Sequence, residues 1–101
     1  MGLRIEVSRE EIEDFCLRNR IRKLAFFGSV TREDFGPESD VDVLVVFEEG
    51  AVVTFFTLYD LEQELSRMLG GRKVDLHTEK GLSRYLRERV LAEAVTQYVQ
   101  P

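Results

Sequence analysis

Residues 26–47 read FFGSVTREDFGPESDVDVLVVF, two apolar runs joined by a polar segment. The second run, residues 41–47, is apolar on both faces after Asp42 and rich in valine, which is typical of a strand covered by other elements. The first run extends back toward the N-terminus and predicts a strand over 22–28. A glycine and a proline interrupt the polar segment, so we expect residues 29–40 to include a loop.

Two aspartates at the start of the second strand indicate a binding site. Asp40 and Asp42 are two residues apart, so their side chains share one face of an extended chain. Neighbouring carboxylates repel each other, and on an otherwise apolar strand they also lose hydration energy. A bound divalent cation removes this conflict, because hard cations take oxygen ligands.

A third aspartate, Asp75, lies within residues 72–77, RKVDLH, which predict another short strand. Its two neighbours in sequence are apolar and share one face, so Asp75 points to the other. If the two strands are neighbours in a sheet, Asp75 can join Asp40 and Asp42. Three carboxylates could hold two Mg²⁺ ions ~3.5–4 Å apart, the usual geometry of two-metal phosphoryl chemistry.

The pair Gly28-Ser29 ends the first predicted strand. Glycine lets the backbone approach a phosphate closely, and serine adds a hydroxyl and an N–H donor. Followed after ten residues by Asp40-Val41-Asp42, the pair resembles the signature of the DNA polymerase beta-like nucleotidyltransferases. The resemblance extends over essentially the entire chain. It is strongest to the minimal nucleotidyltransferases, the MNT proteins that are paired with HEPN toxins in prokaryotes.

The resemblance implies a set of metal-binding carboxylates and a set of nucleotide-binding residues. The implied metal ligands, which are also the implied catalytic residues, are Asp40, Asp42 and Asp75. The implied nucleotide-binding residues are Gly28, Ser29 and Arg32. The commonest family pattern has a basic residue after the serine and a glycine after the arginine, where this chain has Val30 and Glu33.

Helices and strands alternate along the rest of the chain. Apolar residues at helical spacing predict helices over 9–19, 54–69 and 83–98, the last with Leu86, Val90, Ala94 and Tyr98 turned inward. Together with the three strands they predict an α/β fold, a small mixed sheet with helices packed on it. The resemblance implies a polymerase beta palm-like nucleotidyltransferase core, and we expect residues 1–101 to form a single domain.

Composition excludes several classes of function. The formal net charge of −5 argues against electrostatic binding to nucleic acid or to an acidic membrane. No run of apolar residues is long enough to cross a membrane, and no signal peptide is evident, so we expect a cytoplasmic protein. With one cysteine and one histidine, the chain has neither an internal disulfide nor a structural zinc site built from those ligands.

Three features have more than one interpretation. His77 shares the face of Asp75 and could lie near the site, although a lone histidine is more often a surface residue at a strand end. Cys16 lies on the apolar face of its predicted helix and is interpreted as a small core residue. The apolar cluster over residues 51–56 favours core packing, with an interaction surface as the alternative.

The leading hypothesis is an enzyme that uses Mg²⁺ and transfers AMP from ATP to a hydroxyl group. By resemblance, the acceptor is a tyrosine on a partner HEPN toxin, so that the chain acts as an antitoxin. One alternative is a non-catalytic module that occludes the toxin with a decayed nucleotide site. Another is nucleotidylation of a small molecule. Association of the chain with itself is left open.

Overall fold

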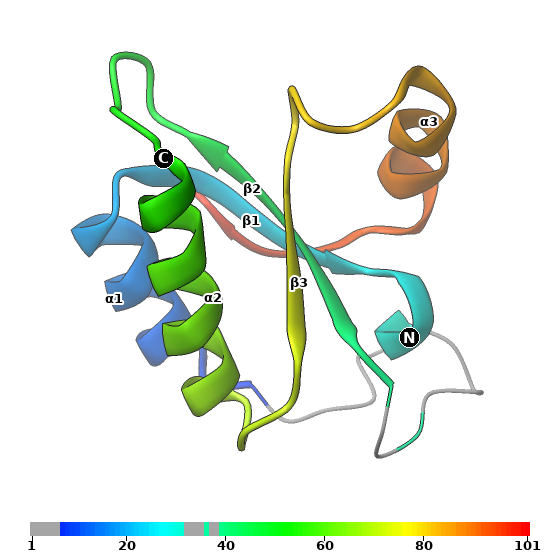
Figure 1. Cartoon of the computed structure of the whole chain (residues 1–101), viewed down its shortest axis with the longest axis horizontal. Coiled ribbons are helices and arrows are strands. Elements are labelled where there is room, and N and C mark those ends of the chain that lie inside the picture. The colour runs from blue at the N-terminus through cyan, green and yellow to red at the C-terminus, as the bar shows by residue number, and fades with distance from the viewer. Residues whose placement is uncertain (1–6, 32–35, 37–38) are drawn as a thin grey trace.

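A computed structural model of the chain describes residues 7–31, 36 and 39–101. Over these residues the chain folds into a four-stranded sheet with three α-helices (Figure 1). The strands are β1 (Ile21–Phe27), β2 (Val41–Phe47), β3 (Val74–Thr78) and β4 (Val95–Val99). The helices are α1 (Arg9–Arg18), α2 (Phe55–Met68) and α3 (Arg84–Glu93), and a short 3-10 helix, η1 (Gly28–Thr31), follows β1.

The sheet is mixed, as the sequence predicts. The strand order is β3-β2-β1-β4; β1 pairs antiparallel with β2 and β4, and β2 pairs parallel with β3. The parallel pair is joined by α2, a crossover helix of the kind that such a connection requires. This pairing makes the strands that carry Asp42 and Asp75 immediate neighbours.

One face of the sheet carries the main hydrophobic core. Helices α1 and α2 lie side by side over this face (Figure 1). Both helices begin at a capped N-terminus, with the Ser8 hydroxyl accepting from the Glu11 N–H and the Thr54 hydroxyl accepting from the Thr57 N–H. The core residues contributed by the helices are Ile12, Phe15, Cys16, Leu61 and Leu65. Cys16 is buried in this core, as predicted.

The opposite face of the sheet is covered only in part by the described residues. Helix α3 packs there through Val90, which joins Leu82, Phe27 and Leu44 in a second and smaller apolar cluster. Val41, Val43 and Val45 face the main core, so the alternate residues of β2 point to this second face. Asp42 is among those alternate residues, so the carboxylates lie on the face away from α1 and α2.

The prediction of a final helix over 83–98 is wrong in its second half. Helix α3 ends at Glu93, and residues 95–99 form β4 along the free edge of β1. Val90 is buried as predicted, whereas Leu86 is exposed. The strand is favoured because it satisfies the backbone groups of β1 that would otherwise lie unpaired at a sheet edge.

The apolar cluster before α2 does not pack into the core. Val52, Phe55 and Phe56 are 85%, 89% and 83% exposed. The favoured interpretation of core packing is therefore wrong for these three side chains. Among the described residues, no helix is both long and apolar enough to span a bilayer.

Candidate active site

Three side chains on β2 and β3 meet on the second face of the sheet. The parallel register pairs Asp42 with Asp75, and His77 lies one step further along the same face of β3. One ligand atom from each of the three lies within 4.8 Å of the other two. Asp75 could join the site only if its strand paired with the strand of Asp42. The structure shows that the two strands are neighbours.

Backbone and side-chain hydrogen bonds fix β3 beside β2. The Val41 N–H donates to the Lys73 carbonyl at 2.9 Å, which starts the parallel ladder just before the two aspartates. On the free edge of β3, the Leu76 N–H donates to Glu62 Oε2 of α2, also at 2.9 Å. The crossover helix therefore holds the strand that presents Asp75 and His77.

The imidazole of His77 lies between the two carboxylates. Its Nε2 is 3.4 Å from Asp75 Oδ2 and 3.6 Å from Asp42 Oδ1. This nitrogen is buried and makes no hydrogen bond within the described part of the chain. The ring packs on Phe27, with centroids 5.3 Å apart, so the second apolar cluster sets its position. A buried polar atom that makes no hydrogen bond is unusual in proteins and is a reason to look for a ligand or a catalytic role.

The carboxyl group of Asp42 is placed where its charge is unfavourable. Burial raises the pKa of Asp42, the nearby His77 opposes this, and the charges of Asp75 and Asp40 raise it further. A bound cation reverses this balance, because it favours the ionised form of every carboxylate that it touches. The arrangement therefore fits a metal better than it fits a purely structural role.

Gly28 is required at its position for two structural reasons. Its φ is +76°, in the left-handed region that side chains other than glycine rarely adopt. A Cβ atom built on it would overlap Oδ2 of Asp42 and lie 3.2 Å from Cγ. The sequence predicts a glycine here for the approach of a phosphate; the structure adds that the missing side chain makes room for the aspartate.

The other predicted site residues are placed as follows. The backbone of Ser29 is part of η1, directly after Gly28. Arg32 lies outside the described residues. Asp40 precedes β2, and its Oδ2 is 3.8 Å from Lys73 Nζ at the surface. Asp40 is thus near Asp42 but is not part of the group that includes Asp75 and His77.

The residues present suit a hard divalent cation. Asp42 and Asp75 supply carboxylate oxygens, which are the ligands that Mg²⁺ prefers, and His77 Nε2 lies within ion-pair distance of both. Sequence reasoning gave His77 the weaker interpretation, because a single histidine carries little information. The signal that placed it at the site was its spacing of two residues from Asp75.

Residues 9–96 match the model of the nucleotidyltransferase domain family. Among curated relatives, the protein adenylyltransferase MntA of Thermococcus cleftensis is 37% identical over 94 residues, covering 85% of this chain and 92% of the relative. MJ0435 of Methanocaldococcus jannaschii, provisionally named a protein adenylyltransferase, is 32% identical over 93 residues. The aligned region covers 92% of this chain and 97% of MJ0435.

Solved structures share the fold. One described provisionally as a minimal nucleotidyltransferase has a TM-score of 0.71 at 40% identity, covering 86% of both chains. A toxin–antitoxin structure with AMP-PNP has a TM-score of 0.75 at 20% identity, covering 93% of this chain and 75% of the other. A tri-AMPylated HEPN toxin of Shewanella oneidensis in complex with an MNT antitoxin has a TM-score of 0.67 at 19% identity, covering 91% and 70%. The paired aspartates, the glycine turn and these likenesses together place this chain in the nucleotidyltransferase domain family, as a minimal nucleotidyltransferase.

Proposed function

We propose that this nucleotidyltransferase transfers AMP from ATP, with Mg²⁺, to a tyrosine hydroxyl of a HEPN-type partner and thereby silences it. The curated relatives named as protein adenylyltransferases support protein as the acceptor. The neighbour that holds an AMPylated HEPN toxin together with an MNT antitoxin supports this class of partner. The neighbour with AMP-PNP supports an adenine nucleotide as the donor.

The observation that carries the proposal is the contact between Gly28 and Asp42. The turn that would receive the triphosphate and the carboxylate that would hold the metal are in direct contact, with no room for a side chain between them. Asp75 lies beside Asp42 in register, so the second carboxylate faces the same space. Phosphate and metal sites must adjoin for a metal ion to bridge protein and nucleotide.

Asp42 and Asp75 are the proposed core of the metal site, and Asp40 is the third proposed ligand. The contact between Asp40 and Lys73 does not prevent this role, because the Asp40 side chain is half-exposed, at 45%, and that of Lys73 is exposed, at 79%. Exposed ion pairs contribute only about 0.2–1 kcal/mol, so the contact with Lys73 is a weak competitor for a metal. His77 Nε2 is a further donor that faces the same two carboxylates.

The transfer forms a bond between the tyrosine oxygen and the α-phosphorus of ATP. The bond from that phosphorus to the oxygen bridging the α- and β-phosphates breaks, pyrophosphate leaves, and the phenolic proton is released. When held by Asp42, Asp75 and Asp40, Mg²⁺ would supply positive charge to the triphosphate and would lower the pKa of the attacking hydroxyl. Gly28, Ser29 and Arg32 are proposed to hold the phosphates, as the family resemblance implies.

Labelled ATP tests the proposal directly. The purified chain is incubated with Mg²⁺, a purified HEPN-type partner protein, and ATP labelled on either the α- or the γ-phosphate. We expect the α-label to be transferred to the partner and the γ-label to be released. Asp42→Asn should abolish transfer, whereas Asp60→Asn, an exposed aspartate on α2, should not. Transfer of the γ-label, or transfer that survives Asp42→Asn, would contradict the proposal.

Other expectations from the sequence stay predictions. They are a single domain over residues 1–101, a cytoplasmic location, and the absence of nucleic-acid and membrane partners. Association of the chain with itself also stays open, and light scattering of the purified protein tests it.

A further inference from the structure

A β-bulge in β1 directs two consecutive cationic side chains to the same face of the sheet. The pairing with β2 shifts register between Ile21 and Lys23. Ile21 and Leu24 are both buried in the main core, although they are three residues apart and regular alternation would place them on opposite faces. The bulge resolves this conflict and leaves Arg22 and Lys23 together on the opposite face.

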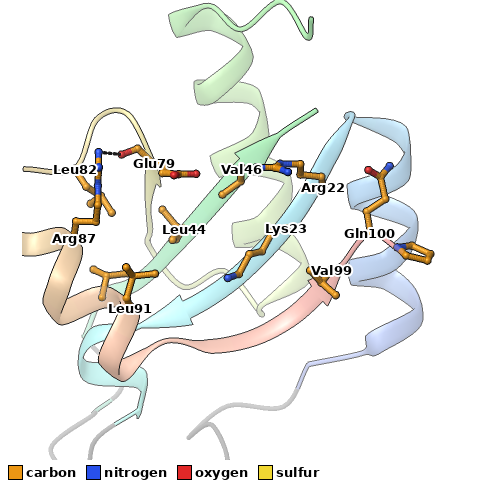
Figure 2. A pocket seen from close by; sticks show the side chains of 12 residues that line it. Arg22, Lys23, Leu44, Val46, Glu79, Leu82, Arg87, Leu91, Val99 and Gln100 are labelled. Atoms are coloured by element: carbon orange, nitrogen blue, oxygen red, sulfur yellow. Dashed lines mark hydrogen bonds between the residues drawn. The ribbon is translucent and has the colours of Figure 1, made fainter. Parts of the chain in front are cut away.

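Arg22 and Lys23 line a cavity of about 450 Å³ on that opposite face. The cavity lies between α3 and β4, and Figure 2 shows Lys23 projecting into it from β1, with Arg22 beside Val46. Its apolar lining includes Leu44, Val46 and Val99. We call this cavity the α3–β4 groove.

The charge of the α3–β4 groove is opposite to that of the chain. Arg22, Lys23 and Arg87 line it together with a single acidic side chain, Glu79, whereas the chain as a whole has a net charge of −5. Among the described residues, none of these three cations has a carboxylate within ion-pair distance. The Arg87 guanidinium donates instead to the Glu79 backbone carbonyl at 3.2 Å, so this contact is not an ion pair.

The groove and the candidate active site share one face of the sheet. Asp42, Leu44 and Val46 are alternate residues of β2, with Asp42 in the site and the other two in the groove. Four residues of a strand span about 13 Å. A macromolecule that occupied the groove would therefore also reach the metal site. The second apolar cluster, through which α3 packs on the sheet, lies between the two.

We infer that the α3–β4 groove docks an acidic, partly apolar surface segment of the acceptor protein, about 13 Å along β2 from Asp42. The inference rests on the proposed function for the identity of the acceptor. Three cations against one acidic side chain fit carboxylates, and the apolar lining of Leu44, Val46 and Val99 fits aliphatic side chains. The groove is separate from the residues proposed to hold ATP and the metal. Docking there would therefore affect which acceptor protein binds, and not the chemical step.

A protein segment fits this groove better than a nucleic acid does. Nucleic-acid binding relies on an extended basic surface, and the chain is acidic overall. The lining also offers apolar side chains and no aromatic ring on which a base could stack. Cations confined to a small apolar groove favour a short acidic segment instead.

Fluorescence anisotropy with two synthetic peptides tests the docking without any catalytic step. One labelled peptide alternates leucine with aspartate, and its counterpart alternates leucine with lysine. We expect the purified chain to bind the acidic peptide at least about fivefold more tightly. The net charge of the chain favours the lysine peptide, so this preference would have to arise from local cations. A labelled single-stranded RNA is measured in the same assay. Equal binding of the two peptides, or tighter binding of the lysine peptide or of the RNA, would overturn the inference.

Charge-reversal variants locate the preference in the groove. Lys23→Glu and Arg22→Glu should each reduce the preference for the acidic peptide at least about fivefold. Arg9→Glu, the same charge change at an exposed position of α1, is the control and should keep it. Arg22 is exposed, so its variant decides the matter if Lys23→Glu fails to fold by circular dichroism. An equal loss in the Arg9 variant would overturn the inference.

AMP transfer to the HEPN-type partner protein is measured separately on the same variants. We expect the Arg22 variant to raise KM for the partner at least about fivefold without changing kcat. If the original chain transfers no AMP but the peptide preference is present, the proposed function fails and the groove stands. If transfer occurs and KM is unaffected by the variants, the inference about the groove fails and the proposed function stands.

Discussion

Replacing Gly28 by alanine tests the contact between the glycine turn and Asp42. The new Cβ would overlap Oδ2 of Asp42, so the carboxylate must move by on the order of 1 Å to reach an ordinary separation. Metal ligands tolerate about 0.2 Å, and a displacement of this size in a reacting assembly costs about a hundredfold in rate. We therefore expect Gly28→Ala to reduce AMP transfer about a hundredfold.

The same substitution also strains the backbone, and a matched variant removes that effect from the comparison. A non-glycine residue at the φ of +76° costs about 1–2 kcal/mol of unfolding free energy, or roughly 5–15 °C in melting temperature. Gly50 has a similar φ of +84°, but a Cβ there would meet nothing within 4 Å. Gly50→Ala should lose comparable stability and keep its activity.

The assay is transfer of α-labelled AMP at a temperature where both alanine variants are folded, with thermal melting as the stability measurement. The difference in activity between the two variants isolates the displacement of Asp42. If Gly28→Ala is as active as Gly50→Ala, the overlap with Asp42 has no catalytic consequence, and the reasoning from this contact is refuted.

Further predictions concern Asp42, Cys16 and Phe56. Asp42→Asn should remove the rise in melting temperature that Mg²⁺ and ATP cause together. Without Mg²⁺ and ATP, the variant should melt no lower than the original chain, because burial raises the pKa of Asp42 and makes its negative charge unfavourable in the folded state. A lower melting temperature of the variant would contradict this explanation. Burial raises the pKa of the Cys16 thiol to about 12. At pH 8, a thiol reagent should therefore label Cys16 of the native protein no faster than the protein unfolds. Rapid labelling would count against the buried position. Phe56→Ser should change the unfolding free energy in urea by less than about 0.5 kcal/mol, because the ring is 83% exposed; a loss above about 2 kcal/mol would indicate core packing.

The strands that carry the aspartates could be predicted because their sequence signals are local. Valines on both faces of residues 41–47 indicate a covered strand, and the alternation around Asp75 gives its direction. That the two strands are neighbours could not be deduced from either segment alone. Pairing is decided by the crossover helix and by contacts distant in sequence, such as Glu62 with Leu76.

The C-terminal strand was missed for a related reason. Leu86, Val90 and Ala94 are spaced as in a helix, and no glycine or proline interrupts residues 82–100. The signal for β4 was the β-branched and aromatic content of residues 95–99, VTQYV, which competes with the helical pattern. The unpaired edge of β1 decides between the two, and that edge exists only in the folded sheet.

The environment of His77 shows the same limit at the site. Its two-residue spacing from Asp75 could be predicted, but its position between two carboxylates depends on the register of β3 against β2 and on packing against Phe27. The cations of the α3–β4 groove were not predicted either, because regular alternation would separate Arg22 from Lys23. Only the bulge in β1 brings them to one face.

Intact-mass spectrometry of a HEPN-type partner protein that binds this chain tests the central claim most directly. The partner is incubated with Mg²⁺, ATP and either the original chain or Asp42→Asn. We predict a mass increase equal to one or more AMP groups with the original chain, located on tyrosine by fragmentation, and an unchanged mass with the variant. A partner whose mass is unchanged by the original chain, although the two proteins bind each other, would contradict transfer as the function.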